Sequence, residues 1–361
     1  MFCNERSRYS TKLNFTLYTL HFTLYTKMSK LSPTKIAFLI FLIIGTVYIL
    51  GKQKPYHTNS GKVFGTFYNI TYSSDADLHE EIKKSLMQVD NSLSPFNKQS
   101  IITAINNNID TQPDSMFIHV FTLAQDISSK TGGAFDITVA PLVNAWGFGF
   151  KKGITPDSTT IDSLRQYIGY NTVALCDGKI FKQHPETMLD CSAIAKGYGC
   201  DAVAATLEAN GVENYMVEIG GEVVTKGKNS KGGLWTIGIS KPTDNPTTAS
   251  NELHQIIGIT GKSMATSGNY RNYREENGRK IAHTIDPRTG YPVQHTLLSA
   301  TVIADDCATA DAHATAFMVM GLDKAMEYCN TDKSIDGYFI YSTQTGVLKT
   351  QMTEGFRKYL K

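Results

Sequence analysis

Residues Ala304 to Gly321 read ADDCATADAHATAFMVMG, and this segment determines how we interpret the rest of the sequence. Alanine and other small residues predict a helix, which places Asp311 and Thr315 four positions apart on one face. Both side-chain oxygens can then point at one small target. Mg²⁺ prefers such hard oxygen ligands and completes its shell with water and substrate phosphates. An ordinary helix whose threonine bonds back to the carbonyl four residues earlier explains the same pattern. Evidence from other segments is therefore needed to choose between a metal site and an ordinary helix.

The charge of the chain is unevenly distributed. Of its 35 basic and 33 acidic residues, residues 1–54 hold eight Lys or Arg and one acid, Glu5. The remainder therefore has 27 basic and 32 acidic residues, a net charge of −5. Nucleic-acid binding needs a basic face, so we expect no nucleic-acid partner. The apolar fraction of 41% is typical of a globular protein with a substantial core.

An apolar run follows the basic N-terminal residues. The run from Ile36 to Leu50 has no charged residue and comes after Lys27, Lys30 and Lys35. Its length falls between the apolar region of a signal peptide and a membrane span of about 20 residues. Since no A-x-A-like cleavage site follows, we expect residues 28–54 to be a basic flank and an uncleaved anchor. The anchor would lie in the inner membrane, with the body of the protein on the periplasmic side.

Residues 1–27 contain the near-duplicated segment NFTLYTLHFTLYTK, whereas Met28 begins an ordinary basic flank. A start codon assigned too early would explain this pattern. We therefore expect residues 1–27 to be a doubtful extension that takes no part in the fold.

Helical and strand-like patterns alternate along residues 60–361. Apolar residues at helical spacing predict helices, and β-branched and aromatic residues between glycine turns predict strands. Such a mixture of helices with hairpin-linked strands indicates an α+β domain of helices and antiparallel sheets. Besides the helix that contains Asp311, we predict helices at 77–93, 114–130, 158–168, 192–210 and 323–330; strands at 62–72, 215–219, 222–226, 235–240, 254–260, 263–267 and 298–304; hairpins around Gly178 and ending near Thr350; and a polar loop at 241–252.

The segment Met188 to Gly199, MLDCSAIAKGYG, places a lysine near the predicted start of a helix. We expect a short strand to end at Asp190 and Ser192 to cap the helix. The N-terminus of a helix favours an anion, and Lys196 opposes the helix dipole there unless an anion or an acid compensates it. A solvated lysine and a merely capping aspartate are the alternatives.

Two further segments carry candidate ligand contacts. Residues 131–149, TGGAFDITVAPLVNAWGFG, combine glycine and aromatic residues with one acid, Asp136, which suits a flat ring ligand and a hydrophobic core equally. Residues 283–292, HTIDPRTGYP, form a turn by composition. His283 is either a general base or a satisfied polar residue.

Together these segments resemble the ApbE family, the FAD:protein FMN transferases. The pattern is carried by GAFDITVAPLVNAWGFG, LDCSAIAKGYGCD, VEIGGEV, WTIGISKP, TSGNYRNY, HTIDPRTGYPV and ADAHATAFMVMG, spread over roughly residues 60–350. The resemblance implies a single catalytic domain, residues 60–361, related to the T-fold. It also implies transfer of FMN from FAD to a Thr or Ser hydroxyl of an exported acceptor protein, with release of AMP. By family analogy the acceptor is a subunit of an electron-transport complex.

The resemblance also implies the site residues. Asp311, Thr315 and the backbone carbonyl of Ala193 would hold Mg²⁺, Lys196 would hold phosphates, and His283 is our candidate base because its ordinary pKa lies near neutrality. Phe64 stands where many members have Met, and Cys191 and Ser192 also depart mildly from the family pattern. FAD contacts would come from Phe64, Phe96, Ala134, Phe135, Asp136, Asp190, Lys196 and Ile285.

Two other functions use parts of this site. An FAD pyrophosphatase would use water as the nucleophile and release FMN and AMP. A membrane-anchored flavin-binding or redox protein would neither transfer FMN nor hydrolyse FAD, and it has no need of the pair Asp311 and Thr315. The sequence disfavours this flavin carrier, but it does not decide between the transferase and the pyrophosphatase.

Overall fold

The computed structural model describes residues 32–51, 54–149, 155–242, 253–269, 273–276 and 279–361. The chain divides into two units, Met1–Pro55 and Tyr56–Lys361. In the first unit, the predicted apolar run lies in helix α2 (Pro33–Gly51). None of the helices in the described ranges is both long and apolar enough to cross a membrane. The predicted extension 1–27 and most of the predicted loop 241–252 lie outside the described residues.

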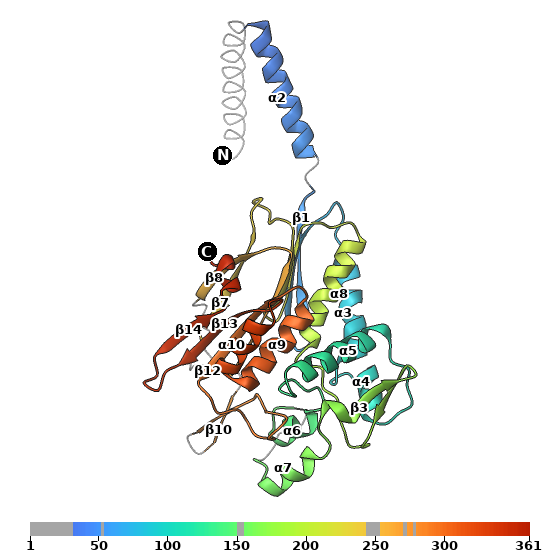
Figure 1. Cartoon of the computed structure of the whole chain (residues 1–361). Coiled ribbons are helices and arrows are strands. Elements are labelled where there is room, and N and C mark those ends of the chain that lie inside the picture. The colour runs from blue at the N-terminus through green and yellow to red at the C-terminus, as the bar shows by residue number, and fades with distance from the viewer. Residues whose placement is uncertain (1–31, 52–53, 150–154, 243–252, 270–272, 277–278) are drawn as a thin grey trace, which may run out of the picture. The chain divides into compact units, whose positions relative to one another are not determined.

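An eight-stranded antiparallel sheet forms the centre of the second unit (Figure 1). Neighbouring strands follow the order β1-β2-β5-β6-β9-β12-β13-β14. Three two-stranded sheets pair β3 with β4, β7 with β8, and β10 with β11. The strands are β1 (Tyr56–Val63), β2 (Thr66–Ser73), β3 (Val173–Cys176), β4 (Lys179–Lys182), β5 (Tyr215–Ile219), β6 (Glu222–Lys226), β7 (Trp235–Ser240), β8 (Leu253–Ile259), β9 (Lys262–Gly268), β10 (Tyr273–Glu276), β11 (Arg279–Ala282), β12 (Leu297–Ala304), β13 (Asp336–Ser342) and β14 (Leu348–Met352).

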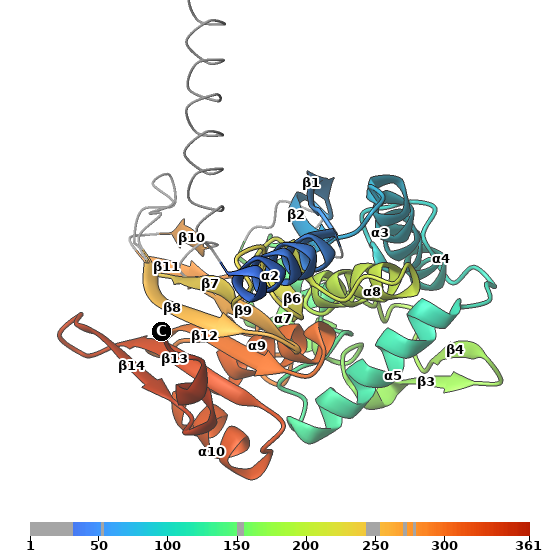
Figure 2. The ribbon, with the colours of Figure 1, turned by 90° about the horizontal axis from the view of Figure 1, so that it is seen from above.

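Helices cover one face of the sheet, with α8 on β5 and β6, α9 on β9 and β12, and α10 on β13 (Figure 2). Helices α8 and α9 pack on each other and on the sheet, α3 packs on α8, and α5 packs on α9. The helices of this unit are α3 (His79–Leu93), α4 (Ile101–Asn106), α5 (Ser115–Lys130), α6 (Ala140–Ala145), α7 (Ser158–Arg165), α8 (Ala195–Ala209), α9 (Cys307–Met320) and α10 (Leu322–Thr331), with short 3₁₀ turns η1 (Tyr170–Thr172) and η2 (Gly355–Tyr359).

Successive side chains of a strand point to opposite faces of the sheet. In the central strands both sets of side chains are buried, each in its own cluster. On β9 and β12, Ala265 and Val302 pack in a cluster with α9, whereas Met264 and Ile303 pack in another with β7 and β8. Helix α9 is buried nearly all round, as a helix of small and apolar residues in a core must be. Its N-terminus is capped by the side chain of Asp306.

Most of the predicted elements and the α+β class are confirmed, but three expectations were wrong. The predicted strand 62–72 is a hairpin, because Phe64 and Gly65, with φ of 49° and 74°, form a turn between β1 and β2. No strand is present around Asp190, whose backbone N–H bonds to the loop residue Ile137. Ser192 does not cap α8, which begins at Ala195 after a turn and has no side-chain cap.

Candidate active site

The residues predicted to bind FAD or Mg²⁺, and the predicted base, all line one cavity of about 1170 Å³. They come from the β1–β2 turn, the loops that follow α3 and α5, the segment before α8 and its first turn, the segment after β11, and α9. A cavity of this size can hold a ligand larger than a typical drug molecule. The predicted residues in its wall are Phe64, Phe96, Ala134, Phe135, Asp136, Asp190, Ala193, Lys196, His283, Ile285, Asp311 and Thr315.

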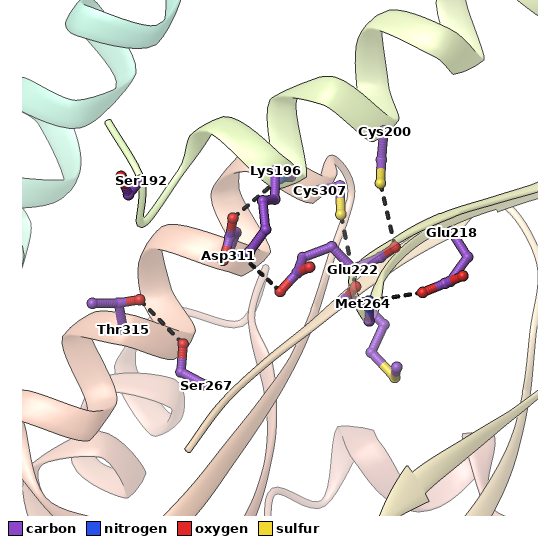
Figure 3. Close-up of polar contacts among 12 residues, drawn as sticks. Ser192, Lys196, Cys200, Glu218, Glu222, Met264, Ser267, Cys307, Asp311 and Thr315 are labelled. Atoms are coloured by element: carbon purple, nitrogen blue, oxygen red, sulfur yellow. Dashed lines mark hydrogen bonds and ion pairs between the residues drawn. The ribbon is translucent and has the colours of Figure 1, made fainter. Parts of the chain in front are cut away.

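Asp311 joins the two helices that form one wall of the cavity. Its side chain is buried, Oδ2 accepts a hydrogen bond from the Gly197 N–H at 3.0 Å, and Oδ1 lies 3.5 Å from Lys196 Nζ (Figure 3). The helices can approach this closely because Gly197 has no side chain. A Cβ there would lie 2.3 Å from the carbonyl oxygen of Cys307 at the start of α9.

The carbonyl of Ala193 lies just before α8, whose N-cap residue is Ile194. Gly197 is in the first turn of α8, where N–H groups have no partner within the helix, and its N–H donates to Asp311 instead. Among the described residues no donor is bonded to the Ala193 carbonyl oxygen. Ala193, Asp311 and Thr315 thus offer a carbonyl, a carboxylate and a hydroxyl in the wall of one cavity. This donor set fits Mg²⁺.

Thr315 does not use its hydroxyl in the way an ordinary helical threonine does. Its Oγ1 lies 3.1 Å from the hydroxyl of Ser267 on β9, and the described part of the chain shows no bond to the carbonyl four residues earlier. Nor do the described residues contain a group of three or more His, Cys, Asp or Glu side chains that could hold a metal. The predicted Mg²⁺ ligands are of a different type, because they combine one carboxylate, that of Asp311, with a hydroxyl and a backbone carbonyl.

Glu222 is a further residue of the wall, which the sequence reasoning did not select. It is 3% exposed, begins β6, and its Oε1 lies 3.0 Å from Lys196 Nζ. Burial raises the pKa of Glu222, an effect that the Lys196 ammonium opposes. Burial lowers the pKa of Lys196, but Asp311 and Glu222 more than offset this and hold the pKa above its ordinary value. The sequence signal was an acid between a Gly-Gly turn and two valines in a strand.

Two predicted ligand contacts fix the shape of the wall. Asp136 accepts hydrogen bonds from the N–H and hydroxyl of Thr138 at one oxygen and from the Tyr170 N–H at the other. Burial raises the pKa of Asp136, an effect that these bonds oppose. Asp190 accepts from the Ser192 N–H at 2.8 Å. Both carboxylates therefore hold loops of the cavity in place.

The aromatic residues occupy different environments. Phe64 has a positive φ, which is uncommon for a bulky residue, and its ring packs so closely on α8 that a Cβ at Gly199 would lie 2.7 Å from it. Phe135 is buried in the core, Phe96 is exposed, and His283 lies edge-on to Phe148 with ring centroids 6.4 Å apart. A ligand in the cavity can contact Phe64, Phe96 and His283 through their side chains.

Comparisons with known proteins agree with the motif pattern. Residues 64–339 match the model of the ApbE family. The chain is 39% identical over 316 residues to the FAD:protein FMN transferase of Haemophilus influenzae, covering 83% of this chain and 90% of the relative. The flavin transferase ApbE from Vibrio cholerae has a TM-score of 0.76 at 34% identity, covering 85% of this chain and 99% of that one. The flavinyl transferase ApbE from Pseudomonas stutzeri, in its apo form, has a TM-score of 0.76 at 30% identity, covering 85% and 98%.

Proposed function

Because this chain belongs to the ApbE family, it is an FAD:protein FMN transferase, and we propose that it transfers FMN to a Thr or Ser hydroxyl of an exported acceptor protein in a Mg²⁺-dependent reaction. The observation that carries the proposal is the set of oxygen donors at Ala193, Asp311 and Thr315. A carbonyl to which no described donor is bonded, a carboxylate and a hydroxyl lie in the wall of the cavity that Lys196 also lines.

In the proposed reaction the acceptor oxygen attacks the FMN-side phosphorus of FAD. The new P–O bond forms while the bond from that phosphorus to the bridging oxygen breaks, and AMP leaves with this oxygen. FMN remains on the acceptor as a phosphoester, and the hydroxyl proton passes to a base. His283 is our candidate for the base because it lines the cavity and because the ordinary pKa of histidine lies near neutrality.

The other residues of the wall bind and orient FAD. The ammonium of Lys196 binds pyrophosphate oxygens, and Asp136 and Asp190 hold the surrounding loops in place. Asp311, Thr315 and the Ala193 carbonyl would hold Mg²⁺, which neutralises charge that develops on the pyrophosphate.

The proposal is tested by incubating the protein with FAD, Mg²⁺ and an exported candidate acceptor that has a threonine among small residues. We expect covalent flavin on the acceptor, equimolar AMP, and no labelling when that threonine is replaced by alanine. Release of AMP and free FMN without labelled acceptor would instead establish a pyrophosphatase. Tight FAD binding without AMP under any metal condition would establish a flavin carrier.

We also propose that residues 28–54 anchor the protein in the inner membrane with the catalytic domain on the periplasmic side, where an exported acceptor is available. Support comes from the sequence pattern, in which an uncharged run follows three lysines. Protease treatment of intact spheroplasts should digest Tyr56–Lys361 if the domain lies outside. Protection of this domain until the membrane is lysed would contradict the proposal.

A further inference from the structure

Lys196 lies between two buried carboxylates that come from different elements. Its Nζ is 3.0 Å from Glu222 Oε1 on β6 and 3.5 Å from Asp311 Oδ1 on α9, so the ammonium is closer to Glu222 (Figure 3). Asp311 has a second partner, the Gly197 N–H. The metal-ligand carboxylate implied by the family therefore shares its lysine with a residue that has no assigned role.

The surroundings of Glu222 are unusual for a carboxylate with a purely structural role. Its Oε2 is buried and has no hydrogen-bond partner among the described residues. Buried polar atoms usually have partners, and an ionised carboxylate is costly to bury unless an opposite charge offsets the cost. For Glu222 this charge is the Lys196 ammonium. The burial of an ionised Glu222 therefore depends on the charge of Lys196.

We infer that Glu222 is a positioning residue that draws Lys196 away from Asp311 and so keeps the Asp311 carboxylate available to a divalent cation. With both carboxylates ionised, the cluster of Glu222, Lys196 and Asp311 has a net charge of −1, which attracts a cation. Without the charge of Glu222 the cluster would be neutral, and Lys196 would pair with Asp311 alone. The inference rests on the proposed function, because it assumes a cation at Asp311.

The test measures Mn²⁺ binding to the full chain without FAD, by electron paramagnetic resonance of free Mn²⁺. Mn²⁺ is a suitable probe because it binds the same oxygen donors as Mg²⁺. Loss of a group that supports a metal ligand typically costs about 10-fold to 100-fold in metal affinity. We expect a loss of this size for Glu222→Gln.

The matched control is Glu218→Gln. Glu218 lies on the neighbouring strand β5, accepts a hydrogen bond from the Gly221 N–H at 2.8 Å, and lies outside the set of described residues that line the cavity. The amide oxygen of glutamine can accept the same bond. This variant removes an acidic group of the same kind near the site without touching Lys196, so its Mn²⁺ affinity should match the wild type.

A second variant separates charge from packing. Glu222→Asp keeps the charge, so it should recover much of the Mn²⁺ affinity that Glu222→Gln loses. If the Gln variant does not fold, the Asp variant should still bind Mn²⁺. Equal affinity of Glu222→Gln and wild type would overturn the inference, as would equal losses in the Asp and Gln variants. A wild-type protein that binds no Mn²⁺ would instead contradict the Mg²⁺ site itself.

Discussion

The carboxylate of Asp311 connects the packing of two helices to the composition of the cavity wall. One oxygen holds the start of α8 through the Gly197 N–H, and the other lies near the Lys196 ammonium. A substitution at Asp311 can therefore act on the fold, on the charge of the wall, or on both. A variant that keeps the hydrogen bond and removes the charge separates these effects.

Asp311→Asn is such a variant, because the amide oxygen can still accept from Gly197. We expect the midpoint of thermal unfolding to change little. AMP release from FAD should fall by at least about 100-fold, since metal-assisted charge stabilisation contributes several kcal/mol. Wild-type rates of AMP release at low Mg²⁺ would show that Asp311 is not a metal ligand.

At the same scale, the sequence predicts side chains that are close in the chain better than those that the fold brings together. Asp311 and Thr315 could be paired because four residues of helix separate them. The contact between Lys196 and Glu222 joins a helix to a strand, and no local spacing specifies it. Likewise, the hydrogen bond from Gly197 to Asp311 joins two helices that are far apart in the chain.

Among the elements, α8 and α9 are held at a distance that depends on a single glycine. A Cβ at Gly197 would lie 2.3 Å from the Cys307 carbonyl oxygen and 2.9 Å from the Ala308 Cα, which are backbone atoms that cannot rotate away.

The bounds of strands β5 and β6 were predicted correctly, because the Gly220-Gly221 turn separates the two strands. The β1–β2 hairpin was missed because its turn uses a phenylalanine in the left-handed region.

Gly197→Ala should separate the two helices and weaken the bond to Asp311. Overpacking of a core typically costs about 1–3 kcal/mol, so chemical denaturation should show a lower free energy of unfolding, and AMP release should fall. Gly233→Ala is the control, because a Cβ there would come no closer than 3.8 Å to its nearest neighbour. Unchanged stability of the Gly197 variant would mean that the helices are not in this contact.

The N-terminus of α9 should make the stability of the fold depend on pH. Asp201 accepts hydrogen bonds from the N–H groups of Cys307 and Ala308, yet burial raises its pKa from 3.8 to about 7. Between these values the folded protein retains a proton that the unfolded chain has released. The contribution of Asp201 is therefore fully present below pH 3.8 and is lost as the pH rises to about 7.

Asp201→Asn tests this expectation, because asparagine does not titrate. Relative to wild type, the variant should gain free energy of unfolding as the pH is raised from about 4 to 7, by about 1.4 kcal/mol for each unit of the pKa difference. Denaturation curves at several pH values provide the measurement. Parallel pH profiles for the two proteins would indicate that Asp201 has an ordinary pKa in the fold.

At the scale of the whole molecule, Tyr56–Lys361 is a compact unit that contains the sheet, its covering helices and every predicted site residue. The α+β class followed from the mixture of patterns in the sequence. The order of the eight strands did not, because the neighbours β2 and β5, β6 and β9, and β9 and β12 are joined by long connections. Sequence patterns specify elements locally, whereas these pairings form only when the chain collapses.

Removal of residues 1–50 should leave a folded and active domain, because the site residues lie at or beyond Phe64. The shortened protein should bind FAD and release AMP at wild-type rates. Cell fractionation should find it outside the membrane fraction, with the full chain as the control. Aggregation or loss of FAD binding would show that the N-terminal apolar run is needed by the fold.

The backbone carbonyl of Ala193 affects how the site would be found by mutational scanning. A backbone oxygen cannot be deleted by changing the side chain on its own residue, so substitutions at Ala193 report only on shape. The sensitive position is Gly197, whose side chain is a hydrogen atom and which has no ligand role. A scan that ranks residues by lost activity would therefore emphasise a glycine and overlook the neighbour that offers the oxygen.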